Sequence, residues 1–406
     1  MFGYKTTALA VWLLLFANLV AAGDNRLQMR IAAGLSADDN YGLRTAFRND
    51  VVGALARVGV NYKRHTERSD WQIDALVQDE YLSQPLDEEN DYAKLTIKGA
   101  RKYRRLELSG NLSFIRDTTL TDEALTSGPT TVNVERDRAA ADLSLAMGIS
   151  ERQFSRVTLY HQALRFDEFS RELTEYDYNT AVVQYFYSLT ELHRMYLSAA
   201  MDRVDYQDFE PRSLVFNGQL FFDNTQSTSA SLGLRGSVSE RLTYDVSVGY
   251  RQTDYEGQYV IRTLFGDVFV PYEEEGNGVV ADVNLRYGGE TSLGWIKLNR
   301  RLSPNSVGSV IEYRSLALGS EARLSKKFTV TGEILLRQQR SDLEQDTDDN
   351  LDNVYVIVGA EWALTPQLKL GGEYRYLERT YTSNNVDTES NRIQVSVTWL
   401  LDELQW

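Results

Sequence analysis

Apolar and polar residues alternate along most of the chain beyond residue 25. In the segment 242–251, every second residue is Leu, Tyr or Val, and the residues between them are mostly polar. A period of two is typical of a β-strand with two different faces, whereas an amphipathic helix repeats at spacings of three and four. The pattern therefore predicts an all-β protein.

We predict eighteen strands. They lie near residues 27–37, 50–64, 70–82, 91–103, 105–117, 135–149, 153–167, 176–188, 192–205, 225–238, 241–254, 277–288, 291–301, 312–325, 327–341, 353–364, 367–381 and 390–400. Eight of them alternate weakly (27–37, 91–103, 153–167, 176–188, 192–205, 225–238, 291–301 and 312–325), so sixteen strands is the alternative. The predicted lengths suit a tilted strand that crosses a bilayer, which needs about 9–11 residues.

The predicted connections alternate between short and long. Short ones include 150–152, 239–241, 288–290, 326–327 and 365–367, and long ones include 118–134, 206–224, 255–276, 342–352 and 382–389. Strict alternation puts every short turn at one end of a sheet and every long loop at the other. This layout is that of an outer-membrane barrel with short periplasmic turns and long extracellular loops.

Alternation alone does not say whether the apolar face meets lipid or a protein core. The strand lengths favour lipid, and so do the aromatic residues near predicted strand ends, such as Phe154, Phe328 and Trp362, which suit interfacial girdles. A soluble secreted sandwich or propeller is the alternative. We therefore predict a transmembrane antiparallel β-barrel that forms one domain over residues 23–406.

Residues 1–22 have the pattern of a secretory signal peptide. Lys5 supplies the positive start, Thr6 to Val20 is an apolar stretch, and Val20 and Ala22 provide small residues before a cleavage site that follows Ala22. A single membrane anchor is the alternative. With the barrel pattern, the segment predicts the outer membrane of a Gram-negative cell.

Composition narrows the possible chemistry. The absence of Cys excludes disulfides and thiolate chemistry, and the formal charge of −15 argues against a nucleic-acid partner. Only three His residues occur, and no Ser, His and Asp are spaced to indicate a catalytic triad. We predict no enzyme activity, no catalytic residue, no cofactor and no metal site.

If the apolar face points outward, the residues between the apolar positions line the lumen. The charged residues predicted there are Arg57, Lys63, Asp74, Glu80, Glu107, Asp142, Asp245, Arg251, Asp282, Arg286, Glu333, Arg337, Glu361, Lys369, Glu373, Arg375 and Arg392. The two signs are nearly balanced, which predicts a hydrated interior. Cross-strand salt bridges that brace the wall are the alternative role for each of them.

The negative charge concentrates in predicted external loops. Residues 341–353 hold six carboxylates and no cation, and Glu273, Glu274 and Glu275 form a second cluster. Asp346, Asp348 and Asn350 have the spacing of the first ligands of a calcium loop, but Leu351 stands where such a loop needs Gly and no Glu closes the set. We expect solvated loops, with divalent bridging to lipopolysaccharide as the alternative.

Two short segments carry a resemblance to a known family. They are Ser36-Ala37-Asp38-Asp39-Asn40-Tyr41, followed by Asn49-Asp50-Val51-Val52, and Tyr374-Arg375-Tyr376 with Glu389-Ser390-Asn391-Arg392, ending at Trp399. With these motifs the mature chain resembles the beta-barrel porin 2 family, outer-membrane barrels associated with exopolysaccharide or capsule production. The resemblance implies a role in polysaccharide export and brings no catalytic residues.

Taken together, the sequence predicts a porin-like outer-membrane barrel that serves as a conduit or accessory in exopolysaccharide export. Its expected partners are outer-membrane lipid, lipopolysaccharide, a polysaccharide substrate and other export components. A general or solute-selective porin is the first alternative function. A structural surface barrel with a closed lumen is the second.

Overall fold

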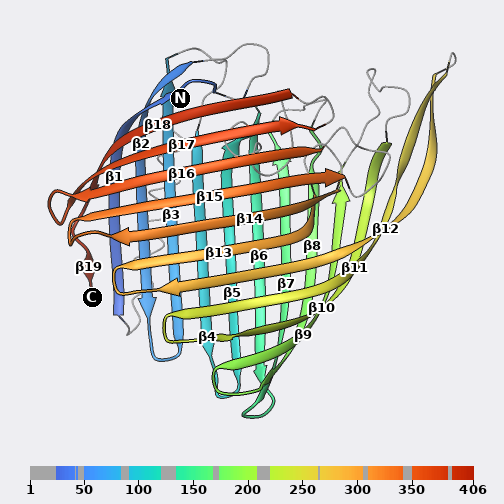
Figure 1. The fold of residues 1–406 in the computed structure, drawn as a ribbon, viewed down its shortest axis with the longest axis horizontal. Coiled ribbons are helices and arrows are strands. Elements are labelled where there is room, and N and C mark those ends of the chain that lie inside the picture. Colours follow the sequence, from blue (N-terminus) through green and yellow to red (C-terminus); the bar gives the residue numbers. More distant parts are fainter. Residues whose placement is uncertain are drawn as a thin grey trace.

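The computed structural model describes residues 24–41, 43, 50–83, 91–119, 134–167, 173–207, 220–263, 266–304, 310–341, 350–382 and 386–406, and these form one closed antiparallel sheet (Figure 1). The predicted signal segment and its cleavage site after Ala22 lie outside these residues. Among the residues described, no helix combines the length and apolar composition that a membrane crossing requires.

The barrel has eighteen strands, and a short nineteenth follows them. They are β1 (Asp24–Asp38), β2 (Val51–His65), β3 (Ser69–Leu82), β4 (Tyr92–Lys102), β5 (Leu106–Thr118), β6 (Glu135–Gly148), β7 (Gln153–Phe166), β8 (Tyr176–Ser188), β9 (His193–Tyr206), β10 (Leu220–Ser237), β11 (Leu242–Thr263), β12 (Gly266–Gly288), β13 (Ser292–Pro304), β14 (Val310–Arg323), β15 (Phe328–Ser341), β16 (Leu351–Ala363), β17 (Leu368–Tyr381), β18 (Val386–Leu400) and β19 (Leu404–Gln405). Each barrel strand pairs with its neighbours in sequence, which confirms the predicted count of eighteen over sixteen.

The sheet closes between its first and last long strands. β1 pairs antiparallel with β18 from Arg30 opposite Leu400 to Asp38 opposite Arg392. Closure pairs the first long strand with the last, and unpaired strand edges are what a lipid environment does not tolerate.

The two segments that carry the family resemblance meet at this seam. The Asp38 carboxylate accepts hydrogen bonds from the Asn40 N–H at 2.9 Å and from the Ser390 hydroxyl at 2.8 Å. Asp39 accepts two more from the backbone and side-chain amides of Asn391, at 2.7 and 2.9 Å. These motifs therefore join the two ends of the barrel.

The chain after Trp399 continues the seam. Leu404 and Gln405 form β19, which pairs with Leu27 and Arg26 of β1. The backbone groups of Asn25 and Trp406 then exchange two hydrogen bonds of 3.2 Å each. The sequence predicted no strand in this tail.

The connection predicted as a long loop at 255–276 is wrong. β11 and β12 pair without interruption from Leu242 opposite Tyr287 to Thr263 opposite Gly266, so this segment is mostly strand. The hairpin extends well beyond the neighbouring strands (Figure 1). β12 pairs with β13 only between Ala281 and Gly288, and the β13 residues that follow Arg300 pair with β14 alone.

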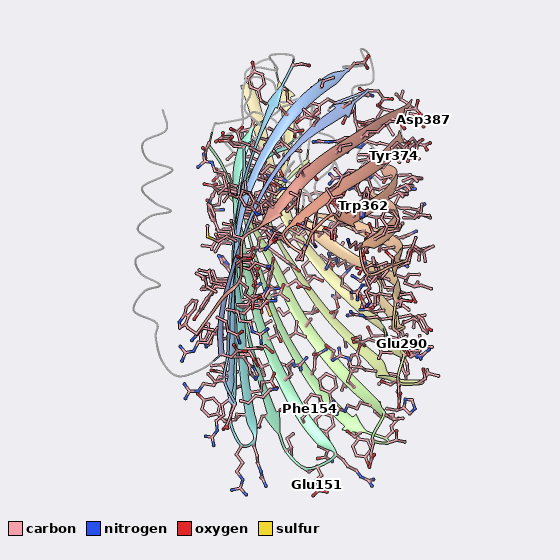
Figure 2. All side chains as sticks on the ribbon, turned by 90° about the vertical axis from the view of Figure 1, so that its left-hand side faces the viewer. Glu151, Phe154, Glu290, Trp362, Tyr374 and Asp387 are labelled. Atoms are coloured by element: carbon pink, nitrogen blue, oxygen red, sulfur yellow. The ribbon has the colours of Figure 1, made fainter. Side chains whose placement is uncertain are left out.

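Side chains leave the wall on both faces (Figure 2). Large exposed apolar residues gather on one face of the barrel strands; examples are Leu35, Leu197, Val248 and Val358. The exceptions among the described residues are β4, which has none, and the far end of β12, where Val268, Phe269 and Val270 are exposed on both faces. Register places the charged residues predicted for the lumen on the opposite face. We call the first face the outer face and the second the lumen face.

Candidate functional site

A row of polar residues crosses four strands of the lumen face near the short-turn end. Register places Arg194 of β9 opposite Arg235 of β10, Arg235 opposite Asp245 of β11, and Asp245 opposite Asn284 of β12. The Arg235 Nε donates to Asp245 at 2.7 Å. Pairing of successive antiparallel strands thus gathers side chains from segments up to 90 residues apart.

These residues border a hollow of about 410 Å³. Arg194, Arg235 and Arg286 supply three guanidinium groups to its lining, while Asp245, which Arg235 binds, and Glu191 supply two carboxylates. Among the described residues, Arg194 and Arg286 make no ion pair, so the hollow keeps an excess of positive charge. A volume of a few hundred Å³ is the size of sites that hold small ligands.

An aromatic cluster lies directly above this row on the same face. The rings of Phe154 and Phe186 stack with centroids 4.2 Å apart and planes within 5° of parallel. Tyr196 continues the cluster at 5.2 Å from Phe186, and its hydroxyl donates to Asp245 at 2.9 Å. Phe186 is fully buried.

Three guanidinium groups cover these rings. Arg194 lies over Phe154 at 5.5 Å, Arg156 lies over Phe186 at 5.8 Å, and Arg235 lies 5.7 Å from the Phe186 centroid. Attraction between a cation and a ring face holds such side chains without a carboxylate partner. Arg156 and Arg194 are therefore held over the rings without an ion pair among the described residues, whereas Arg235 is also bound by Asp245.

The prediction that Phe154 belongs to an interfacial girdle is wrong. Its ring faces the lumen, because it shares a face with Phe186 and Tyr196 rather than with the exposed Val183 and Tyr185. The position beside a short turn was the only sequence signal, and it does not distinguish the two faces.

An apolar cluster narrows the lumen towards the long-loop end. It joins Leu164 of β7, Tyr176 of β8, Val204 of β9, Tyr255 of β11 and Val310 of β14, all buried. β7 and β14 are far from adjacent in the sheet, so contact within one cluster brings separated parts of the wall together. Leu302 of β13 packs against the same cluster.

Opposite parts of the wall also approach each other below this cluster. The Arg301 guanidinium of β13 acts electrostatically on the phenol groups of Tyr160 in β7 and Tyr178 in β8. The Tyr178 hydroxyl also donates to Asp202 at 2.9 Å. Polar groups from opposite parts of the wall therefore lie close to each other at this level of the lumen.

The seventeen charged residues predicted for the lumen all lie on the lumen face by register, spread around the wall. Several bind each other or a neighbour: Arg392 with Glu80, Lys369 with Glu361, Arg375 with Glu373, Arg251 with Glu312, Asp245 with Arg235, Arg57 with Gln78, Asp74 with Asn61, and Arg337 over the Tyr313 ring. Within the described residues, no ion pair involves Lys63, Glu107, Asp142, Asp282, Arg286 or Glu333. Only Asp245 and Arg286 border the hollow, and a pore-lining role for the set stays a prediction.

Sequence reasoning missed Arg156, Arg194, Arg235, Phe186 and Tyr196. They lie on β7 to β10, the strands whose alternation is weak, so their faces could not be assigned. The basic residues near the predicted short turns were the one sequence signal that could have indicated this site. The predicted calcium-like residues Asp346 and Asp348 lie outside the described residues, and no cluster of metal ligands occurs within the described ones.

No protein-family model matches the chain, and no curated protein matches it. Among solved structures, it is similar to OpdQ of Pseudomonas aeruginosa, with 9% identity, 93% of this chain and 97% of that chain covered, and a TM-score of 0.44. OccAB4 of Acinetobacter baumannii gives 8% identity, coverage of 94% and 99%, and a TM-score of 0.46. The ferric-catecholate import receptor Fiu of E. coli gives 7% identity, coverage of 92% and 81%, and a TM-score of 0.44. Sequence identities and TM-scores this low carry no information about the solute that this protein handles.

Proposed function

We propose that this protein is an outer-membrane porin that favours small anionic solutes. The observation that supports it best is the basic hollow on the lumen face, where Arg194 and Arg286 have no carboxylate partner among the described residues. The proposed function is that of a solute-selective porin and not that of a polysaccharide conduit.

The membrane location is supported by the outer face. Leu197, Val248 and Val358 are about half exposed or more, and similar residues follow one another around the barrel. Soluble proteins rarely expose continuous apolar patches larger than a few hundred Å². A bilayer covers such a band, and outer-membrane barrels place their short turns in the periplasm.

Preference for anions is supported by the chemistry of the hollow. A guanidinium group presents paired N–H donors that match carboxylate and phosphate oxygens. The ring of Tyr244, which also lines the hollow, adds an aromatic surface beside these donors. A small organic carboxylate can therefore be held by charge at one end and by ring contact at the other.

Passage of a polysaccharide chain, which the family resemblance implies, gains no support from the lumen. The apolar cluster of Leu164, Tyr176, Val204, Tyr255 and Val310 reduces the cross-section near the long loops. A polymer rich in hydroxyl groups would meet apolar side chains there, while a small solute needs only a narrow path beside them.

Planar-bilayer recording of the purified, folded protein tests the proposal. We expect stepwise currents that favour chloride over potassium, and a loss of that preference in the Arg194→Gln/Arg286→Gln variant. The Lys63→Gln/Lys98→Gln variant is the matched control, because it removes two lumen-face cations from β2 and β4, away from the hollow.

Two results would contradict the proposal. Absence of any current in folded wild-type protein would support the closed structural barrel. Block by neutral oligosaccharides, with no response to benzoate or small dicarboxylates, would instead support the polysaccharide function.

A further inference from the structure

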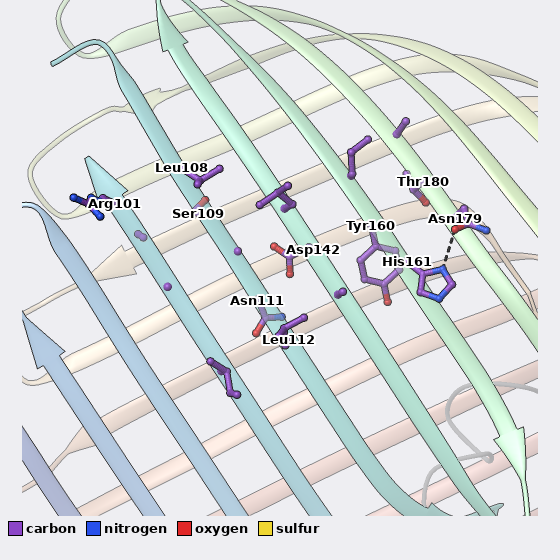
Figure 3. A pocket seen from close by; sticks show the side chains of 18 of the residues that line it. Arg101, Leu108, Ser109, Asn111, Leu112, Asp142, Tyr160, His161, Asn179 and Thr180 are labelled. Carbon is purple, nitrogen blue, oxygen red and sulfur yellow. Dashed lines mark hydrogen bonds between the residues drawn. The ribbon is translucent and has the colours of Figure 1, made fainter. Parts of the chain in front are cut away.

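A groove of about 970 Å³ crosses the outer face over β3 to β9 (Figure 3). Register places its outward-facing residues in one row across the strands: Trp71, Gly99, Gly110, Leu143, Leu159 and Ala181. Met201 of β9 continues the row. We call this feature the outer groove.

Small residues form the floor of the outer groove. Gly110, Ala141 and Ala181 leave the backbone close to the surface, and the Trp71 ring lies over Gly99. Leu108, Leu112 and Leu159 form the ridges. Seven strands lie about 4.8 Å apart, so the groove is about 29 Å long. Because barrel strands tilt by about 35–45°, a groove that runs across them passes obliquely through the apolar band.

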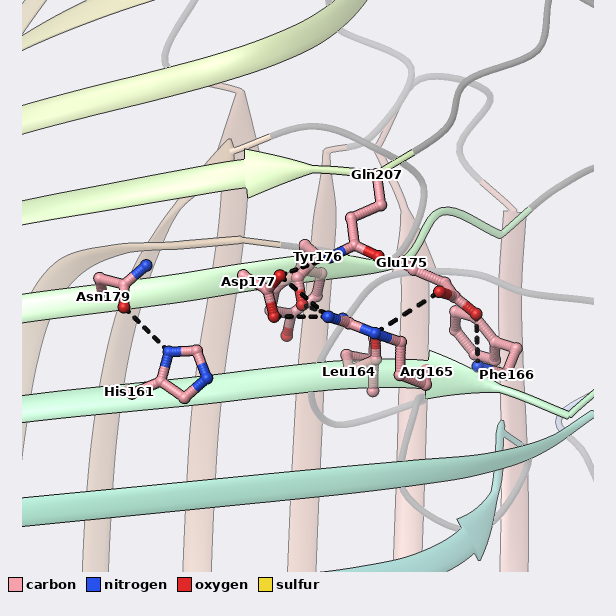
Figure 4. Close-up of polar contacts among 9 residues, drawn as sticks. All are labelled: His161, Leu164, Arg165, Phe166, Glu175, Tyr176, Asp177, Asn179 and Gln207. Atoms are coloured by element: carbon pink, nitrogen blue, oxygen red, sulfur yellow. Dashed lines mark hydrogen bonds and ion pairs between the residues drawn. The ribbon is translucent and has the colours of Figure 1, made fainter.

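At the end nearest the long loops, the groove is bordered by polar groups that already have partners. His161 Nδ1 and Asn179 Oδ1 are 2.9 Å apart, and the nearby Arg165 contacts Asp177 at 2.7 Å and Glu175 at 3.7 Å (Figure 4). Arg203, which also lines the groove, binds Asp205 at 2.8 Å. This end carries no excess positive charge.

The opposite end reaches the turn between β4 and β5, where the charge is not balanced. Arg101 lies over the Tyr103 ring at 5.3 Å, and both residues line the groove. Arg104 and Arg105 follow within the same exposed turn, whereas Lys102, like Lys98, lies on the lumen face of β4. Within the described residues, none of the cations Arg101, Arg104 and Arg105 makes an ion pair. The neighbouring β2–β3 turn adds one cation, Arg68, and one carboxylate, Glu67.

We propose that the outer groove binds an anionic glycerophospholipid of the periplasmic leaflet. Its acyl chains lie against the floor between the leucine ridges, and its phosphate meets the cations of the β4–β5 turn. The difference between the two ends selects this leaflet, because among the described residues the short-turn end alone offers uncompensated positive charge. The inference depends on the proposed membrane location but not on anion transport.

A second copy of the chain fits this surface less well. Packing of another barrel wall here would bring more apolar surface but nothing to neutralise the cations beside Tyr103. Each Lys or Arg near an anionic lipid surface strengthens binding to it. A phosphate group supplies the missing charge directly.

Native mass spectrometry of the folded full chain in detergent, with added phosphatidylglycerol or phosphatidylcholine, tests the proposal. We expect wild-type protein to retain phosphatidylglycerol in preference. The variant Arg101→Gln/Arg104→Gln/Arg105→Gln should bind it at least about tenfold more weakly. Ala141→Phe, or Ala181→Phe if the former does not fold, should reduce retention of both lipids by filling the floor.

The control variants change other parts of the same surface. Arg323→Gln/Lys326→Gln/Lys327→Gln removes three cations from the β14–β15 turn, and Ala230→Phe adds a ring to the outer face of β10; neither should alter lipid retention. Equal retention of the two lipids, or an equal loss in the control turn, would overturn the proposal. So would loss of self-association in Ala141→Phe with lipid binding unchanged, since the groove would then be an interface between copies.

Discussion

The ring of Tyr196 lies over Gly233 on the neighbouring strand, in the space that a side chain at position 233 would need. A Cβ atom added to Gly233 would lie 2.1 Å from the Tyr196 Cζ. The ring is buried and its hydroxyl donates to Asp245. The position of Tyr196, and with it the hydrogen bond to Asp245 in the lining of the basic hollow, therefore depends on a glycine in β10.

The variant Gly233→Ala should reduce the free energy of unfolding by about 1–3 kcal/mol, because the new methyl group displaces the ring. In Tyr196→Ala/Gly233→Ala the methyl group has space, so the two substitutions should not be additive. Urea unfolding in micelles measures both effects. Gly372→Ala is the control, because no atom lies within 4 Å of its added Cβ, and its effect should stay within about 0.5 kcal/mol.

Arg235 and Asp245 should affect ion selectivity in opposite directions. Asp245→Asn leaves the Arg235 charge unpaired and should raise the chloride-to-potassium permeability ratio, whereas Arg235→Gln should lower it. One charge a few ångströms from the path in water is worth about 1 kcal/mol, which corresponds to about a fivefold change. Reversal potentials across a salt gradient measure the ratio, and a shift in the same direction in both variants would contradict the assignment.

Removal of large side chains from the apolar cluster should widen the channel. Tyr255→Ala/Val310→Ala is expected to raise single-channel conductance, because both side chains are buried in the cluster that joins separated parts of the wall. Val358→Ala, on the outer face, should leave conductance unchanged. If the widened variant conducts like wild type, the cluster is not the narrowest point.

The seam between β1 and β18 should depend on Asn40. Its side-chain amide donates to the Glu389 carbonyl at 2.8 Å and to the Thr388 hydroxyl at 3.2 Å, and the side chain is almost fully buried. Asn40→Ala leaves these acceptors unsatisfied and should cost about 1–3 kcal/mol of unfolding free energy. Asn277→Ala, at an exposed position of β12, is the control for the same urea measurement, and equal losses in the two variants would argue against a special role for the seam.

Most of the barrel could be predicted from the sequence, because a two-residue period survives wherever one face is apolar and the other polar. The predicted strand at 176–188 matches β8 exactly in its bounds, and most other ends differ by one or two residues. The segment 255–276 was the main failure. Its Gly, Pro and Glu content is typical of a loop, yet the continuous ladder between β11 and β12 holds it as strand.

The candidate site was harder to predict, because its strands break the simple pattern. Phe186 and Tyr196 are apolar residues on the lumen face, while Asn179 and Arg203 are polar residues on the outer face. Without a clear face assignment, the arginines beside them could not be placed. Which of them remain without a carboxylate depends on cross-strand register, which the sequence does not specify.

The long β11–β12 hairpin extends beyond the part of β12 that pairs with β13. That pairing runs from Gly288 to Ala281 and stops there. Above that level the backbone of β12 offers donors and acceptors to any extended polypeptide in the surrounding medium, and such edges promote aggregation. The three consecutive carboxylates Glu273, Glu274 and Glu275 lie on this stretch. Their mutual repulsion with an identical hairpin gives each molecule a means to stay separate from its neighbours in a crowded membrane.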